Sequence, residues 1–233
     1  MAQSLRTPIP ITNHPSQRGF WSLILVQFQA AFSDFALKNL VIFLGLSLAL
    51  SQGQREGLVP LAQALLSLPF LLFSMAGGYF ADRFSKRSVT IGVKLFEVSI
   101  MFFALVGLGL GNLTLALSAI FLMGVHSAMF GPSKYGLLPE LVPEKDLSWG
   151  NGILELGTFG AIIIGTIAGA VLSQTFAAQP AWPGVILIAL ALAGLAMSLG
   201  ITRVPAANPT KAFRLNFVAD LLYAMLNPRI RLQ

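Results

Sequence analysis

The sequence predicts an all-α membrane protein, a polytopic bundle of six transmembrane helices. The first observation is composition: 55% of the 233 residues are hydrophobic and 10% are charged, whereas soluble domains carry roughly 25% charged residues. The second is that apolar residues form runs of the roughly 20 residues that a helix needs to cross a bilayer. The third is that short segments rich in charge, glycine and proline separate these runs. A soluble domain of this length could not bury so much apolar surface.

Six apolar runs follow a polar start, and several carry local signals. Pro69, near the middle of the second run, predicts a kink. Gly111 and Asn112 predict a tight turn after the third run. The stretch 131–150, rich in acids and prolines, is expected to be a loop. We expect a cytoplasmic N-terminal arm at 1–19, the bundle at 20–201, and a basic cytoplasmic tail or central-linker segment with a surface helix at 202–233; the approximate spans are 20–50, 58–80, 88–110, 113–130, 151–172 and 182–201.

The distribution of Lys and Arg predicts the orientation of the bundle. Bases recur in the arm, after the second and fourth runs and in the tail, whereas the connections after the first, third and fifth runs contain only Arg55. Because basic loops stay on the cytoplasmic side of a membrane, both termini are expected in the cytoplasm. The net charge of +6 therefore favours membrane lipids as the partner of these loops, and nucleic acid is not expected.

Ionisable side chains inside the runs are candidates for function, because each is costly in a membrane unless a partner or water compensates it. Asp34 and Lys38 are four residues apart, and Lys94 and Glu97 are three apart, so each couple shares a helix face and can form an ion pair. Alternatively, Lys94 is close enough to the cytoplasmic end of its run for the side chain to extend to the membrane surface and keep its ammonium in water. The expected substrate or ion pathway comprises Asp34, Lys38, Glu97, His126, Lys134 and Glu155.

His126 and Glu155 have no obvious partner nearby in the sequence. A histidine near a helix end is either a hydrogen-bonded packing residue or a proton carrier. Glu155 has no base within one turn, so it meets Lys134 or Lys38 from another helix, faces water or is protonated. In the same run, small residues recur every four positions, which lets another helix approach closely. These helix-packing residues are Gly157, Ala161, Gly165 and Gly169.

Motifs for catalysis and for bound cofactors are absent from the sequence. It has no nucleophile elbow, no glycine-rich phosphate loop, no metal-ligand spacing of His and acids, and no His-x-x-x-x-Asp motif. It contains no cysteine, which excludes disulfides and thiolate metal sites. We therefore expect no catalytic residues, no cofactor and no metal, and the chain is not expected to be an enzyme.

The segment between the second and third runs carries a family resemblance. Its glycine, acid and bases resemble the signature loop between helices 2 and 3 of the major facilitator superfamily, with Ser85 where a glycine is usual. The resemblance implies a conformational role, in which these charges lock two helix bundles together on one side of the membrane. The alternative is that they only set the topology. The matching residues are Gly78, Asp82, Arg83, Lys86 and Arg87.

Four further segments resemble one branch of that superfamily, the bacterial lysophospholipid transporters, some of which are fused to an acyltransferase and acyl-ACP synthetase. The segments are 31–39 (AFSDFALKN), 94–97 (KLFE), 130–139 (FGPSKYGLLP) and 150–159 (GNGILELGTF). Phe35 departs from the branch, where an asparagine is usual. Four ordered matches across most of the chain are more specific than the signature loop alone.

The resemblance implies a flippase-like importer of lysophospholipid, chiefly lysophosphatidylethanolamine, in the bacterial cell inner membrane, where the lipid is reacylated. It also implies an acyltransferase or acyl-ACP synthetase as a partner. Members of the family have two six-helix halves with the site between them. The chain is therefore expected to be the N-terminal half, a fragment or truncated product that needs the missing C-terminal half or a second copy.

Other functions stay open at the level of the sequence. A proton-coupled transporter of a drug or organic anion, working through Asp34 or Glu155, predicts dependence on a pH gradient. A non-transporting membrane module that presents lipid to an acyltransferase predicts that Asp34→Asn keeps activity and that deletion of the tail abolishes it. A polytopic membrane enzyme is the weakest alternative, because no catalytic constellation supports it.

Overall fold

The computed structural model describes residues 17–211, and within them it contains six long α-helices, one short 3-10 helix and no strand. All six helices are long and apolar enough to cross a membrane, so the predicted all-α fold class is confirmed. The surface helix expected in the tail and most of the N-terminal arm lie outside the described residues. The elements are α1 (Gln17–Ser47), α2 (Gln52–Arg83), α3 (Lys86–Gly109), α4 (Leu113–Leu141), η1 (Glu144–Asp146), α5 (Leu147–Thr175) and α6 (Ala181–Ser198).

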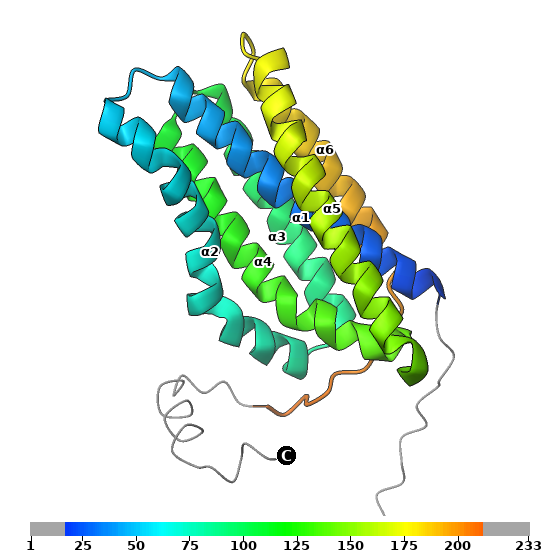
Figure 1. Ribbon diagram of the computed structural model, residues 1–233. Helices are drawn as coiled ribbons and strands as arrows, with labels where there is room; N and C mark the ends of the chain where they lie inside the picture. Colours follow the sequence, from blue (N-terminus) through cyan, green and yellow to red (C-terminus); the bar gives the residue numbers. More distant parts are fainter. Residues whose placement is uncertain (1–16, 212–233) are drawn as a thin grey trace, which may run out of the picture.

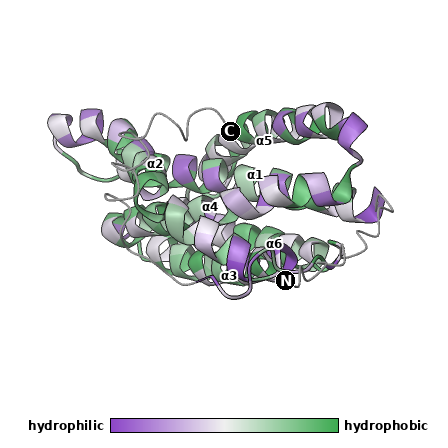
Figure 2. Ribbon diagram, turned by 90° about the horizontal axis from the view of Figure 1, so that it is seen from below, coloured by the Kyte–Doolittle hydropathy of each residue, from purple (hydrophilic) through white to green (hydrophobic). Residues whose placement is uncertain are grey.

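Helices α1 and α4 occupy the middle of the bundle. α1 packs on α5 and α6, α4 packs on α2 and α3, and α3 also packs on α6. Figure 2 accordingly shows α1 and α4 between α3 and α6 on one side and α2 and α5 on the other. Polar side chains on the two middle helices are therefore placed to meet side chains from all the others.

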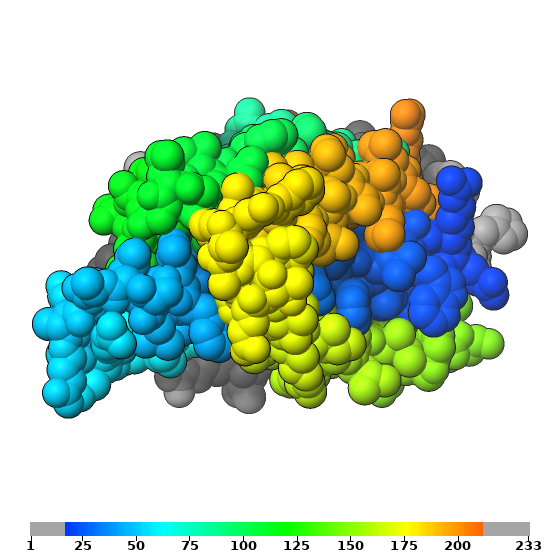
Figure 3. All heavy atoms as spheres, turned by 90° about the horizontal axis from the view of Figure 1, so that it is seen from above, coloured from blue at the N-terminus to red at the C-terminus, as the bar shows by residue number. Residues whose placement is uncertain are grey.

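The connections between helices alternate between the two ends of the bundle (Figure 1). One end holds the start of α1, the α2–α3 and α4–α5 connections and the segment after α6. Figure 3 looks onto the other end, where α1 joins α2 and α5 joins α6. We call the first end the basic end, because it carries Arg18, Arg87, Lys145 and Arg203.

Local sequence explains how the helices turn into one another. Gly111 has a positive φ of 61°, and its N–H donates to the carbonyl of Leu108 at 3.1 Å while the N–H of Asn112 donates to that of Gly107 at 2.9 Å. This is a Schellman ending, which a glycine adopts without steric cost. The Asn112 side chain then accepts from the N–H of Leu115 and caps α4. The predicted tight turn at these two residues is therefore present.

Helix α4 is longer than the sequence suggests. The stretch after Phe130, which we expect to be a loop, continues as helix to Leu141, with Pro132 and Pro139 inside it. Its apolar residues Leu137 and Leu141 are fully or almost fully buried, and this burial outweighs the helix-breaking effect of the prolines. The helix ends where Val142, just before a further proline, adopts the extended backbone that a residue preceding proline favours.

Helix α2 also contains two prolines, Pro60 and Pro69. Figure 1 shows the helix bent along its length, as expected for proline inside a helix. Gly124 of α4 packs against this region: a Cβ there would lie 2.8 Å from Pro69 Cγ. The proline and the glycine together let α2 and α4 come close despite the bend.

Helix α5 contacts α1 through its small residues. A Cβ placed on Gly165 would lie 2.5 Å from the carbonyl oxygen of Phe32, and one on Gly169 would lie 2.6 Å from that of Ala36. Ala161 is fully buried in the same contact region, whereas Gly157 leaves room, since its Cβ would lie 3.9 Å from Ile24 Cγ2. The two glycines thus bring the backbones of α5 and α1 together.

Candidate functional site

Asp34 lies near the middle of α1 and turns toward α4. Its side chain is buried, and Ser127 Oγ of α4 donates to Asp34 Oδ2 at 2.6 Å. The other oxygen, Asp34 Oδ1, has no hydrogen-bond partner among the residues that the structure describes. An unpaired buried carboxylate oxygen is costly, and its capacity to accept a hydrogen bond is unused.

Lys38 does not pair with Asp34, although the spacing allows it. Instead its ammonium donates to Gln63 Oε1 of α2 at 2.9 Å and lies 4.2 Å from the centre of the Phe35 ring. The two side chains leave α1 in different directions, one toward α2 and the other toward α4. They interact only electrostatically, without an ion-pair contact.

Lys94 and Glu97 of α3 form the ion pair that their spacing suggests. Both side chains are completely buried, so Lys94 does not snorkel to the membrane surface. Lys94 Nζ also donates to Gln29 Oε1 of α1, and Gln29 Nε2 donates to Glu97 Oε1 at 2.9 Å and to Ser33 Oγ at 2.8 Å. These bonds join α1 to α3 inside the bundle and satisfy both charges.

His126 extends this network from α3 through α4 toward α1. Its Nε2 lies 3.2 Å from Glu97 Oε2, close enough for an ion pair but without the angles of a hydrogen bond. Its Nδ1 lies 3.4 Å from Ser127 Oγ, the hydroxyl that donates to Asp34. We call the set of Gln29, Ser33, Asp34, Lys94, Glu97, His126 and Ser127 the buried polar network; all of them are buried except Ser127, which is half-buried.

Gly194 of α6 closes the buried polar network on its outer side. A Cβ at this position would lie 2.7 Å from Gln29 Cδ and 2.8 Å from Lys94 Cε. The absence of a side chain therefore leaves the space that these two long side chains occupy. Any residue larger than glycine here would push Lys94 or Gln29 away from Glu97.

Three members of the buried polar network are missing from the sequence-based candidates: Gln29, Ser33 and Ser127. The cost of a charge in a membrane marks ionisable residues as candidates, and an uncharged amide or hydroxyl in an apolar run does not stand out in this way. Gln29 and Ser33 do carry a signal, since they lie four residues apart on one face of α1. Ser127 carries none, because a helical serine commonly bonds its own backbone.

Lys134 and Glu155 lie on α4 and α5 without a direct ion pair between them. Tyr135 bridges the gap: its hydroxyl donates to Glu155 Oε1 at 2.9 Å, and the Lys134 ammonium lies 4.8 Å from the centre of the Tyr135 ring. Lys134 interacts electrostatically with both Glu155 and Asp34. The direct partner of Glu155 is thus a hydroxyl, whereas the sequence suggested Lys134 or Lys38.

The signature residues gather at the basic end. Gly78, Asp82 and Arg83 lie in the last turns of α2, Lys86 and Arg87 begin α3, and only Phe84 and Ser85 connect the helices. Lys86 pairs with Glu140 at the end of α4. Lys211, far along the chain, pairs with Asp82 at 2.5 Å.

Arg83 and Arg87 bond mainly to backbone carbonyls of the segment that follows α6. Arg83 donates to the carbonyl of Lys211 at 2.9 Å and to the Tyr79 hydroxyl at 2.6 Å. Arg87 donates to the carbonyls of Ile201 and Leu199 at 2.7 and 2.9 Å. The ion-pair partner of Asp82 is Lys211, and Arg83 makes no ion pair with it in the described chain.

We expect Arg87→Gln to loosen the end of α6, because a helix C-terminus leaves carbonyls that Arg87 now satisfies. Two partly exposed charged hydrogen bonds are lost, which corresponds to about 1–2 kcal/mol. Hydrogen exchange should therefore quicken about tenfold or more at the amides of 199–204, without change in α4. Arg203→Gln, an exposed base beside the same segment, is the control and should leave this exchange rate unchanged. Equal exchange in both variants would contradict the capping role.

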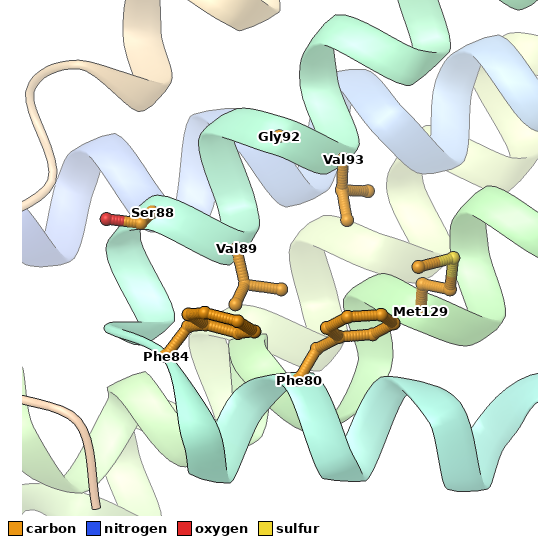
Figure 4. Close-up of a pocket in the computed structure, with 7 residues that line it drawn as sticks. All are labelled: Phe80, Phe84, Ser88, Val89, Gly92, Val93 and Met129. Atoms are coloured by element: carbon orange, nitrogen blue, oxygen red, sulfur yellow. The ribbon is translucent and has the colours of Figure 1, made fainter. Parts of the chain in front are cut away.

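An apolar groove separates α2 from α3 beside the signature residues. It encloses about 300 Å³, and Figure 4 shows Phe80 from α2 and Phe84 from the α2–α3 connection facing Val89 and Val93 from α3, with Met129 alongside. The two phenylalanine rings stack 6.1 Å apart. Ser88 is the only polar residue of its lining in the described chain, so the groove suits hydrocarbon and offers no charge to a head group.

Comparison with known proteins places this architecture in a family. The model of the Major Facilitator Superfamily matches residues 23–229. The chain is 30% identical to the lysophospholipid transporter LplT of Salmonella newport over 223 residues, and 32% identical to that of Salmonella schwarzengrund over 220 residues. Each alignment covers 93% of this chain and 50% of the relative. The chain thus spans about half the length of the curated relatives it matches.

Solved structures give the same fold. The peptide transporter POT in complex with sulfate superposes with a TM-score of 0.66 at 14% identity, over 92% of this chain and 44% of that one. A POT family transporter in complex with 5-aminolevulinic acid superposes with a TM-score of 0.65 at 18% identity, over 92% and 45%. The six membrane-length helices and the Salmonella relatives support a multi-pass inner-membrane protein. The family model matches most of this chain, residues 23–229, which shows that the chain belongs to the Major Facilitator Superfamily.

Proposed function

We propose that this chain is one six-helix half of a transporter that moves lysophospholipid, chiefly lysophosphatidylethanolamine, across the bacterial inner membrane for reacylation. The observation that carries the proposal is the unpaired oxygen Asp34 Oδ1, within electrostatic reach of Lys134 and, through Lys134, of Glu155. An acid on α1, a base on α4 and an acid on α5 therefore lie among otherwise apolar side chains. The names of the Salmonella relatives support the same substrate class.

A zwitterionic head group matches these charges. Asp34 Oδ1 is buried and has no hydrogen-bond partner in the described chain, so it can accept a hydrogen bond from an ammonium once movement of the helices exposes it, and the Lys134 ammonium can neutralise a phosphate. The acyl chain then lies against apolar side chains or lipid, where burial stabilises it by about 0.8 kcal/mol per CH₂ group. A sugar is bound mainly by uncharged hydrogen-bonding groups, whereas charged groups predominate at this site.

A second six-helix unit completes the path in this proposal. Lys38, Lys134 and Glu155 are only partly buried, and charged groups facing lipid are costly. A C-terminal half or a second copy that covers them would create a cavity between two units, the usual arrangement in such folds. In this proposal the further partner is the acyltransferase or acyl-ACP synthetase that reacylates the transported lipid. Reacylation takes place on the cytoplasmic side, so the basic end is cytoplasmic in this arrangement.

The signature residues act as a latch in this scheme. Their bonds to Glu140, to Lys211 and to the end of α6 hold four segments together at the basic end. In this proposal, some of these charged residues exchange their contacts within the unit for contacts with the second unit when the two units move. The basic residues at this end support a cytoplasmic location for it and for both termini.

Uptake of labelled lysophosphatidylethanolamine by inner-membrane vesicles tests the function. Vesicles carry the chain, with or without the C-terminal half of the Salmonella newport relative supplied in trans, and we expect uptake above empty vesicles. Asp34→Asn should reduce that uptake at least tenfold, because an amide cannot neutralise an ammonium. The matched control is Glu56→Gln, which makes the same change at an exposed acid at the start of α2. No uptake in either condition, despite verified insertion, would overturn the proposal.

A further inference from the structure

A second hollow lies at the basic end, away from Asp34. It encloses about 710 Å³ between the start of α1, the end of α4 and the start of α5. Its lining includes Gln17, Phe20 and Trp21 from α1, and Asp146 and Trp149 from the α4–α5 connection and α5. Apolar residues at the end of α4 form the remaining wall. The hollow therefore combines aromatic faces with one carboxylate.

The aromatic side chains form a connected group. The Phe20 ring stacks on Trp149 with centres 5.4 Å apart, and it meets Trp21 edge-on at 5.3 Å. Phe20 is buried, whereas Trp21 and Trp149 are about half exposed, at 49% and 54%. Phe20 thus holds two indoles from different helices at the rim, and indole is the aromatic group that attracts a cation most strongly.

The carboxylate of Asp146 is available to a ligand. Asp146 stands at the N-cap position of α5, but its side chain makes no capping hydrogen bond. Within residues 17–211 it also has no ion pair. It is half-buried, and an ionised carboxylate offers acceptors only. A cation bearing N–H groups would satisfy it.

We propose that this hollow binds the ammonium head group of an ethanolamine phospholipid from the surrounding bilayer. The ammonium lies against the faces of Trp21 and Trp149 and donates to Asp146, while the amide of Gln17 donates to the phosphate. Acyl chains continue along the outward apolar residues of α1 and α5, such as Leu25 and Leu156, which are 48% and 69% exposed. The site is separate from the transport path and does not depend on transport.

A lipid rather than a soluble amine fits the position of the hollow. It opens at the end of membrane-length helices, the depth at which tryptophan indoles meet lipid head groups. The adjoining faces of the two helices are apolar, so they offer a soluble amine nothing beyond the aromatic group. Phosphatidylglycerol, an anionic phospholipid, lacks the ammonium and would face Asp146 with like charge.

Tryptophan fluorescence of the full chain in nanodiscs tests the site. Trp182 lies at the start of α6, at the opposite end of the bundle, so Trp182→Phe leaves Trp21 and Trp149 as reporters. Phosphatidylethanolamine is titrated into phosphatidylglycerol nanodiscs, and a neutral galactolipid replaces it in the parallel series. We expect a saturable change in emission with phosphatidylethanolamine and none with galactolipid. An equal change in both series would overturn the proposal, because it would reflect only the loss of surface charge.

Two further variants in the Trp182→Phe background locate the ammonium. Asp146→Asn should raise the half-saturating fraction of phosphatidylethanolamine at least fivefold, whereas Glu144→Gln, an exposed acid of the same connection, should not. Trp21→Leu should weaken binding similarly, read from Trp149, and it keeps the test decisive if Asp146→Asn does not fold. Unchanged half-saturation in the folded variants would overturn the proposal.

Discussion

Replacing Lys94 by methionine is expected to destabilise the bundle by about 3–5 kcal/mol, because it leaves Glu97 in the interior without its ammonium partner. Lys94 and Glu97 are both fully buried, and the ammonium also holds Gln29 in place. His126 Nε2 lies 3.2 Å from Glu97 Oε2, but His126 does not supply the bond that Lys94 makes to Gln29. The measurement is reversible unfolding by SDS in bicelles, followed by tryptophan fluorescence.

The double variant Lys94→Met with Glu97→Gln separates an unpaired charge from lost packing. Glutamine keeps the size of Glu97 and an acceptor for Gln29 Nε2, so the double variant should recover most of the lost stability. Lys145→Met, at an exposed lysine of η1, is the control and should stay within about 0.5 kcal/mol of the native chain. A single variant as stable as the control would contradict the role of the buried ion pair.

The sequence predicted what depends on short spacings. The lengths of the apolar runs predicted six helices, Gly111 and Asn112 predicted the turn before α4, and the separation of Lys94 and Glu97 suggested their pair. Each of these features is set within a few residues of the chain, where helix geometry alone relates side chains. The expectation of a loop after Phe130 was wrong, because the burial of Leu137 and Leu141 against other helices stabilises a longer α4.

Partners across helices could not be predicted in the same way. Asp34 and Lys38 are neighbours on α1, as their spacing indicates, yet Asp34 turns to Ser127 and Lys38 to Gln63. Which partner each side chain finds depends on which helices flank α1, and the packing order of the helices cannot be read from the sequence. Lys211 is similar: it lies 129 residues from Asp82, and no pattern links the two positions.

Replacing Gly165 by valine is expected to cost about 3 kcal/mol, at the upper end of the usual range for overpacking. Even a Cβ there would lie 2.5 Å from the Phe32 carbonyl oxygen and 3.1 Å from its Cα. These are backbone atoms of α1, so α5 and α1 must move apart, because no flexible side chain can give way. Phe32 is two residues from Asp34, and the same displacement should therefore also lower lysophosphatidylethanolamine uptake.

Gly160→Ala is the matched control for the α1–α5 contact. It lies on the same helix, and a Cβ at Gly160 meets nothing within 4 Å. Alanine should therefore leave stability unchanged or raise it by up to about 1 kcal/mol, since glycine is a poor helix former. Gly165→Ala, measured beside it by SDS unfolding, adds the same single methyl group but should destabilise. If the two alanine variants unfold alike, α5 does not depend on a backbone contact with α1, and the placement of Asp34 opposite α4 must be secured by α4 and α6 instead.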